Sequence, residues 1–236
     1  MAKKAAVLFD LDNTLYDYDH PHNKALKEVY KVLKKYIPIS FNRFIKLFNL
    51  SKAEIHKELA GTASAHNRVL YFQRLIEKTH NTVEPKIILK LYKAYWDTFL
   101  KSMKLRKDVL PALKKIKKVG MKIVIVTDLT THIQLRKLDK LKISSYVDFL
   151  VTSEEAGSEK PHSIMFLLAL NKLNIIPKEA IMVGDNTVTD IEGANSIGLD
   201  TVLIKNKNPV KRYKEDYRNP NYIIKNISEI LKIIGI

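Results

Sequence analysis

Short apolar runs near both ends of the chain limit the folds open to it more than any other feature of the sequence. Each run is bounded by polar or turn-forming residues, as buried parallel strands are. The runs cover residues 5–9, 122–127, 148–152, 180–184 and 201–204, with a shorter edge candidate at 222–224. Helical patterns lie between them, at residues 108–119, 133–141, 164–173 and 190–197. Strands that alternate with helices predict an α/β fold with a Rossmann-like parallel sheet and right-handed crossovers.

The middle of the chain, from residue 25 to residue 100, has the periodicity of helices alone. Apolar residues recur there at helical spacing, first at Leu26, Val29 and Leu33. Pro38 and Pro85 divide this stretch, which predicts three or four helices inserted after the first strand. We therefore expect an α/β core domain formed by residues 1–16 and 105–236, and a helical cap domain formed by residues 17–104.

Composition restricts the chemistry and the partners. The chain has no cysteine, which excludes disulfides, thiolate zinc sites and a cysteine nucleophile, so oxygen or imidazole must hold any metal. The net charge is +16, but lysines lie along the whole chain instead of gathering on one element with aromatic residues between them. This distribution predicts a lysine-rich solvated surface and no nucleic-acid partner.

No segment of the sequence predicts a membrane location. Asp10 and Asp12 interrupt the first apolar run too early for the core of a signal peptide. No other apolar stretch approaches the length that spans a bilayer. We therefore expect a cytoplasmic protein without a membrane partner, and the sequence leaves both a monomer and a small homo-oligomer open.

Polar residues follow four of the apolar runs, where ligands bind in open parallel sheets. The four sets are Asp10 with Asp12 and Thr14, Thr127 with Asp128, Lys160 with Pro161, and Gly184 with Asp185 and Asp190. Each set alone is better explained as a turn, a strand end, a helix cap or a surface residue. Together they converge on one edge of the sheet, where so many carboxylates require a cation. Oxygen ligands alone indicate Mg²⁺.

The same four sets resemble the motifs of the haloacid dehalogenase superfamily. They read Phe9-Asp10-Leu11-Asp12-Asn13-Thr14, then Val126-Thr127, then Lys160-Pro161, then Gly184-Asp185 followed by Asp190, in the family's order. This resemblance implies a core sheet in which the first strand is central. The helical insertion after the first motif looks like the small cap of the branch that contains phosphoglycolate phosphatase, the pyrimidine nucleotidases and N-acylneuraminate-9-phosphatase.

The resemblance also implies a role for each motif residue. Asp10 is the expected nucleophile, Asp12 the general acid and base, and Thr127 and Lys160 the groups that hold the phosphoryl oxygens. The metal is expected at Asp10, the Asp12 backbone carbonyl and Asp185, with Asp190 as a further acid of the metal site. The implied activity is that of a Mg²⁺-dependent phosphoric monoester hydrolase acting on a small phosphorylated metabolite, such as a sugar phosphate, phosphoglycolate or a nucleotide.

Three other functions use part of the same set of residues. A 2-haloacid dehalogenase needs neither a metal nor a second acid in the first motif, so Asp12 and Asp185 speak against it. A phosphorylatable receiver domain has adjacent acids on its first strand and no helical insertion. A non-catalytic binding module of the same fold is the remaining alternative, although no motif position is lost. In the cap, Arg68 is the candidate substrate contact, and a solvated arginine at a helix start is the competing interpretation.

Overall fold

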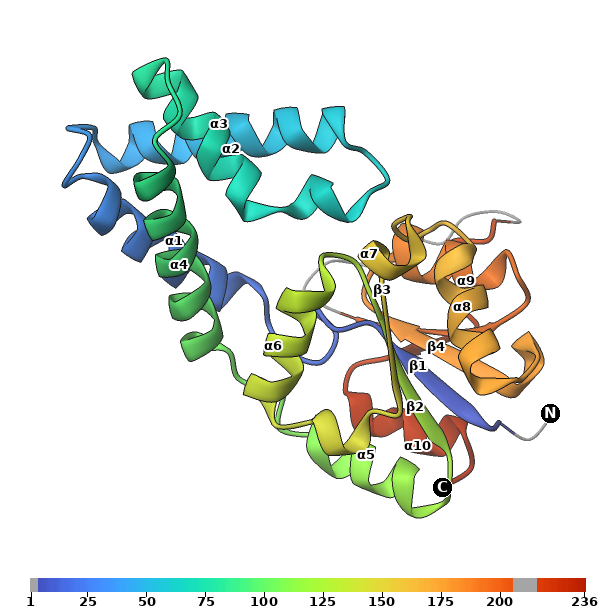
Figure 1. Ribbon diagram of the computed structural model, residues 1–236. Coiled ribbons are helices and arrows are strands. Elements are labelled where there is room, and N and C mark those ends of the chain that lie inside the picture. The colour runs from blue at the N-terminus through green and yellow to red at the C-terminus, as the bar shows by residue number, and fades with distance from the viewer. Residues whose placement is uncertain (1–3, 206–215) are drawn as a thin grey trace. The chain divides into compact units, whose positions relative to one another are not determined.

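The computed structural model describes residues 4–205 and 216–236. The chain divides into two compact units, one formed by Met1–Asp17 with Lys104–Ile236 and the other by Tyr18–Met103. We call the first unit the core and the second the cap, and each is described by itself (Figure 1). Among the residues described, no helix has both the length and the apolar character needed to cross a membrane.

The core is built on one parallel sheet, as the sequence predicts. Its strands are β1 (Ala6–Phe9), β2 (Lys122–Thr127), β3 (Phe149–Thr152), β4 (Ala180–Gly184), β5 (Asp200–Ile204) and β6 (Tyr222–Ile224). They lie in the order β3-β2-β1-β4-β5-β6, and every neighbouring pair is parallel. The central position of β1 is therefore confirmed, and each strand agrees with its predicted range to within one residue at either end.

Helices cover both faces of this sheet. They are α5 (Val109–Lys118), α6 (Thr131–Leu141), α7 (Ser153–Ala156), α8 (Ile164–Leu173), α9 (Gly193–Asn195) and α10 (Ile230–Ile233). Ala6 and Leu8 of β1 pack with Met165 and Phe166 of α8 in one buried cluster. Because side chains alternate along a strand, the other residues of β1 face the opposite side of the sheet, where α5 and α10 lie (Figure 1).

The stretch after β4 differs from the sequence prediction. Instead of one helix over residues 190–197, a π-helical turn (Thr187–Glu192) precedes the short α9. The backbone N–H of Ile191 donates to the Asn186 carbonyl at 3.2 Å, a spacing of five residues. The Asn186 side chain also accepts from the backbone of Val188 and Thr189, which fixes the start of the turn. Such wide turns are rare and often lie at functional sites.

The cap consists of four α-helices and one 3₁₀ turn. Its elements are α1 (Asp19–Leu33), α2 (Phe41–Glu58), the 3₁₀ turn (Ala63–His66), α3 (Arg68–His80) and α4 (Pro85–Ser102). Pro85 occupies the first position of α4, where its missing N–H costs nothing. The buried faces of the helices meet in an aromatic core that includes Phe48, Phe72, Tyr95 and Trp96.

Candidate active site

The carboxyl ends of β1, β2 and β4 bring three of the sequence motifs to one edge of the sheet. Phe9 of β1 is level with Ile125 of β2 and with Val183 of β4. Asp10 therefore leaves the sheet between the ends of the two neighbouring strands. This is the edge at which parallel α/β sheets bind ligands.

Asp10 is buried and held on both carboxylate oxygens. Its Oδ1 accepts from Lys160 Nζ at 2.7 Å, and its Oδ2 accepts from Thr14 Oγ1 at 2.8 Å. Burial raises the pKa of Asp10 well above its ordinary value. Lys160 opposes that rise, while the neighbouring Asp190 and Asp185 add to it. The carboxylate thus lies in a site where negative charge is in excess.

Lys160 is the cation of this site. Its Nζ donates to Asp10 Oδ1 and Asp190 Oδ1, both at 2.7 Å, and to the Val126 carbonyl at 3.1 Å. Burial alone lowers the pKa of Lys160, but the adjacent carboxylates outweigh burial and raise it well above the ordinary value. The ammonium therefore stays charged and joins the first motif to the last.

Asp190 has both oxygens engaged. Oδ1 accepts from Lys160, while Oδ2 accepts from the backbone N–H groups of Asp185 at 3.1 Å and Asn186 at 3.0 Å. The π-helical turn makes this possible because it carries Asp190 back over the end of β4. A β-carbon on Gly184 would lie 2.4 Å from the Asp190 side chain, so the strand must end in glycine at this point.

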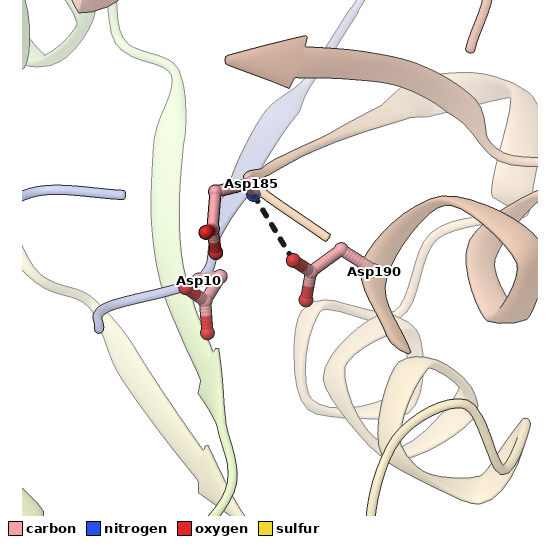
Figure 2. Close-up of side chains that lie close together, drawn as sticks. All are labelled: Asp10, Asp185 and Asp190. Carbon is pink, nitrogen blue, oxygen red and sulfur yellow. Dashed lines mark hydrogen bonds between the residues drawn. The ribbon is translucent and has the colours of Figure 1, made fainter. Parts of the chain in front are cut away.

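Three carboxylates of this edge could hold a metal ion. Asp10, Asp185 and Asp190 each offer one oxygen, and these oxygens lie within 4.8 Å of one another (Figure 2). The donor set consists of oxygen alone, which suits a hard divalent cation. A cation there would also relieve the mutual repulsion that raises the pKa of Asp10. The residues present therefore fit a metal ion.

Asp12 lies two residues beyond Asp10 and has a different set of partners. Lys137 Nζ of α6 donates to both Asp12 carboxylate oxygens at 2.7 Å, and the Tyr16 hydroxyl also donates to one of them. Between Asp12 and Tyr16 the chain turns through Asn13, whose φ of 63° is in the left-handed region that asparagine tolerates. The Asn13 carbonyl accepts from the Arg106 guanidinium.

Thr127 ends β2 with a buried hydroxyl. Gln134 Nε2 donates to Thr127 Oγ1 at 2.7 Å and to the Asp128 carbonyl at 2.5 Å. Because a carbonyl can only accept, the second contact fixes which end of the Gln134 amide faces Thr127. The Thr127 oxygen therefore accepts from Gln134, and its own proton is donated to the Asp128 carbonyl over a long distance of 3.4 Å.

Two of these supporting side chains, Gln134 and Lys137, were missed by the sequence prediction. Both come from α6, and both are completely buried. They lie on the same face of the helix as the buried Ile133, Leu138 and Leu141. Two polar residues among apolar positions of one helical face are the signal that could have singled them out.

In the cap, Arg68 begins α3 and is buried among aromatic rings. Its guanidinium carbon lies 5.3 Å from the ring centre of Tyr71 and 5.6 Å from those of Tyr95 and Trp96. The guanidinium donates to the Tyr18 hydroxyl and the His66 carbonyl. Among the residues that the structure describes, Arg68 forms no ion pair with a carboxylate, and its Nε has no hydrogen-bond partner. It is thus no ordinary solvated arginine.

Other basic groups surround Arg68 within the cap. Burial, together with the charges of Arg68 and Lys52, lowers the pKa of His22 to about 4. Burial likewise lowers the pKa of His56 to about 4, with contributions from His66, Lys52 and Arg68. We call these five residues, Lys52, His22, His56, His66 and Arg68, the cap basic cluster. The charges of Lys52 and Arg68 make the cluster an environment that favours an anion.

A parallel α/β core with three carboxylates that could hold a metal ion, and a buried lysine at the carboxyl edge, has the charges that suit a phosphate group. Comparison with known proteins then gives the family. The chain belongs to the haloacid dehalogenase-like hydrolases, whose family description it matches over residues 7–204. This membership confirms the resemblance drawn from the motifs.

Two relatives and one solved structure narrow the branch. The chain is 43% identical over 200 residues to ribulose-1,5-bisphosphate 5-phosphatase of Halopiger xanaduensis, covering 84% of this chain and 83% of the relative. It is 32% identical to glyceraldehyde 3-phosphate phosphatase of Methanopyrus kandleri, covering 97% and 96%. A crystal structure of a phosphatase of this family from Thermococcus onnurineus matches with a TM-score of 0.75 and 26% identity, covering 98% and 97%. The chain is therefore a phosphatase of this family, a phosphoric monoester hydrolase.

Proposed function

We propose that the protein is a Mg²⁺-dependent phosphatase that hydrolyses a small phosphorylated sugar through a covalent phosphoryl group on Asp10. The observation that carries this proposal is the Lys160 ammonium shared between Asp10 and Asp190, 2.7 Å from each. This contact supports Asp10 as a nucleophile with a cation beside it, and Asp190 as a second acid that holds the same cation. The substrate class follows the relatives, which are phosphatases of ribulose-1,5-bisphosphate and glyceraldehyde 3-phosphate.

The charges around Asp10 suit attack on a phosphate. A carboxylate that approaches a phosphate dianion meets about 8 kcal/mol of repulsion at about 4 Å with an effective dielectric near 20. Lys160 offsets part of that repulsion because its ammonium touches Asp10 directly. Thr14 holds the other Asp10 oxygen, so the carboxylate keeps one orientation. Such fixed positioning is what phosphoryl transfer demands of a protein.

The metal is the second source of positive charge. Asp10, Asp185 and the backbone carbonyl of Asp12 are the groups that would hold Mg²⁺, while Asp190 orients Lys160 and the loop after β4. Once bound, the ion supplies charge stabilisation between the nucleophile and the phosphoryl oxygens. Thr127 turns its hydroxyl proton from the Asp128 carbonyl, 3.4 Å away, to another phosphoryl oxygen.

The reaction proceeds in two steps. In the first, an Asp10 oxygen forms a bond to phosphorus while the bond to the leaving oxygen breaks, and Asp12 gives its proton to that oxygen. In the second, water attacks the same phosphorus, Asp12 takes up the proton of the water, and the Asp10–phosphorus bond breaks. Inorganic phosphate leaves, and both carboxyl groups return to their starting states.

We propose further that the cap unit selects the substrate, and that Arg68 contributes to a site for a second anionic group. The support is the cap basic cluster, in which a buried guanidinium has no carboxylate partner among the described residues. A buried charge without a counter-ion is costly, and an anionic part of a substrate would supply one. A carboxylate or a second phosphate has the required chemistry.

The test is a hydrolysis screen over phosphorylated sugars, phosphoglycolate and nucleotides, with Mg²⁺ and with a chelator. We expect turnover of a sugar phosphate that chelation abolishes. The variant Asp10→Asn removes the nucleophile and should release no phosphate, whereas wild-type protein quenched in acid should carry a phosphoryl group on the peptide that contains Asp10. Turnover by a verified Asp10→Asn sample, or a phosphoryl group on another residue, contradicts the proposal.

A further inference from the structure

Lys137 is a buried lysine at a position where the fold needs an apolar side chain. It lies on the inner face of α6 beside Leu138 and Leu141, and its side chain is completely shielded from solvent. A lysine is rarely buried without a strong reason, because its ammonium loses hydration. In this chain the ammonium contacts both oxygens of Asp12 at 2.7 Å and lies 5.9 Å from the ring centre of Tyr16.

The Asp12 carboxylate does not need this ion pair to stay charged. The Asp12 side chain is 31% exposed, so water could solvate its carboxylate without help from a buried cation. Replacing a buried ion pair by apolar groups is often neutral or stabilising, so the pair is weak evidence for a role in stability. Two contacts from one fixed ammonium, together with the Tyr16 hydroxyl, do confine the Asp12 carboxyl group to one position.

We propose that Lys137 is a positioning residue that holds Asp12 where it passes a proton to the leaving oxygen and later takes one from water. The inference rests on the proposed function, which assigns those proton transfers to Asp12. The contacts that hold the Asp10 carboxylate come from Lys160 and Thr14. Its loss should therefore impair proton transfer and leave nucleophilic attack in place.

This division of roles has a measurable consequence. As the phosphorus–oxygen bond breaks, a weakly basic leaving group such as p-nitrophenolate departs with little need for a proton. An alkoxide of a sugar departs only when its oxygen receives the proton of Asp12. Misplacing Asp12 therefore slows the release of alcohols far more than that of p-nitrophenol.

The experiment compares Lys137→Met with Lys140→Met, the same change at an exposed position of the same helix. Enzyme in excess over substrate, with Mg²⁺, gives the rate of leaving-group release in a single turnover, which reports the first step alone. The substrates are p-nitrophenyl phosphate, phenyl phosphate and the best sugar phosphate of the screen. For Lys137→Met we expect a loss of about 10²-fold on the sugar phosphate, a smaller loss on phenyl phosphate and the smallest on p-nitrophenyl phosphate. Lys140→Met should match wild type on all three.

Two further variants make the outcome decisive. Lys137→Arg keeps the charge and should recover most of the rate on the sugar phosphate, and Lys137→Gln replaces the methionine variant if that does not fold. In an Asp12→Asn background, Lys137→Met should change nothing more, because the group it positions is already absent. An equal loss on all three substrates, or a full additional loss in the Asp12→Asn background, overturns the inference and gives Lys137 a general structural role. A wild-type protein that hydrolyses no phosphate ester, or an Asp12→Asn variant with wild-type rates, overturns the proposed function itself.

Discussion

Lys160 separates two buried carboxylates that could not otherwise share the same edge of the sheet. Its Nζ is 2.7 Å from an oxygen of Asp10 and 2.7 Å from an oxygen of Asp190, and all three side chains are nearly inaccessible to solvent. Removing one partner of a buried charge network leaves the other charges buried and unpaired. The free energy of unfolding then falls by more than the net stabilisation that the ion pairs provided. This residue therefore links the stability of the core to its chemistry.

Lys160→Met should show both effects. Without Mg²⁺, we expect the free energy of unfolding to fall by about 3 to 5 kcal/mol, because Asp10 and Asp190 remain buried without a cation. For a chain of this size the melting temperature should drop by roughly 10 °C or more. Phosphatase activity should fall by at least about 10³-fold, since the charge that offsets the phosphate is lost. Calorimetry checks the loss of stability, and hydrolysis assays check the loss of activity. An unchanged melting temperature would mean that Lys160 does not compensate the charges of Asp10 and Asp190.

Gln134 orients the hydroxyl group of Thr127. Its amide donates to Thr127 Oγ1 and to the Asp128 carbonyl, while its own oxygen accepts no hydrogen bond within the described residues. Gln134→Leu keeps the size of the side chain but removes both donors. We expect kcat/KM to fall about tenfold, the value of one hydrogen bond that orients a reacting group. In a Thr127→Val background the same change should have no further effect on kcat/KM. An equal loss in both backgrounds would mean that Gln134 does not act through Thr127.

At the scale of elements, the strands could be predicted because each is apolar on both faces. β1, β2 and β4 are completely buried apart from Lys122 at the start of β2, so their composition alone separates them from the amphipathic helices around them. Asp10 and Asp185 could be predicted for the same reason, since they directly follow β1 and β4. Asp10 and Asp185 needed only the rule that ligands meet the carboxyl ends of parallel strands.

Two elements could not be predicted in this way. The turn over Thr187–Glu192 is π-helical because Asn186 and the carboxylate of Asp190 fold the backbone over the end of β4, and local propensity carries no signal for such contacts. For α6 the sequence predicts only a helical pattern over residues 133–141. The partner of its buried Lys137 is Asp12, just after β1 and 125 residues away in sequence, whereas buried Gln134 contacts Thr127 of β2, only seven residues before it.

Two histidines of the cap make the stability of its fold depend on pH. His22 and His56 have pKa values of about 4 in the folded cap, against 6.5 when exposed. The unfolded chain therefore binds more protons between pH 6.5 and pH 4, so the stability that is fully present above pH 6.5 is lost as the pH falls toward 4.

His22→Asn should remove part of this pH dependence. The His22 Nδ1 atom lies 2.7 Å from the Tyr95 hydroxyl, and an asparagine amide can keep that hydrogen bond without titrating. For wild type, we expect the free energy of unfolding to drop by on the order of 2 kcal/mol through His22 between pH 7 and pH 4.5. The variant should have a flatter profile in thermal melts, while His132→Asn, at an exposed position of the core, should keep the wild-type slope. A steeper profile in His22→Asn would contradict a neutral buried histidine.

At the scale of the whole molecule, the core and the cap carry different kinds of polar side chains. The acids, the lysines and the hydroxyl assigned to phosphoryl transfer all belong to the core. The cap contributes a cluster of basic groups and no acid of the metal site. The sequence indicated the helical insertion and singled out Arg68. It did not indicate that Tyr18 and Tyr95 lie beside that arginine, because both come from other parts of the cap than α3.

Arg68→Met should separate substrate choice from chemistry. Methionine can fill the space among Tyr71, Tyr95 and Trp96 but cannot bind an anion. A charge-assisted contact is worth about 1.5 to 3 kcal/mol, so we expect kcat/KM on a doubly anionic sugar phosphate to fall roughly tenfold to a hundredfold. The loss on p-nitrophenyl phosphate should be much smaller, because that ester carries no second anionic group. Arg74→Met is the matched control, since Arg74 lies on the same helix and is paired with Glu54 and Glu58. Equal losses on both substrates would make Arg68 a structural residue of the cap, and no loss on either would rule out a substrate contact.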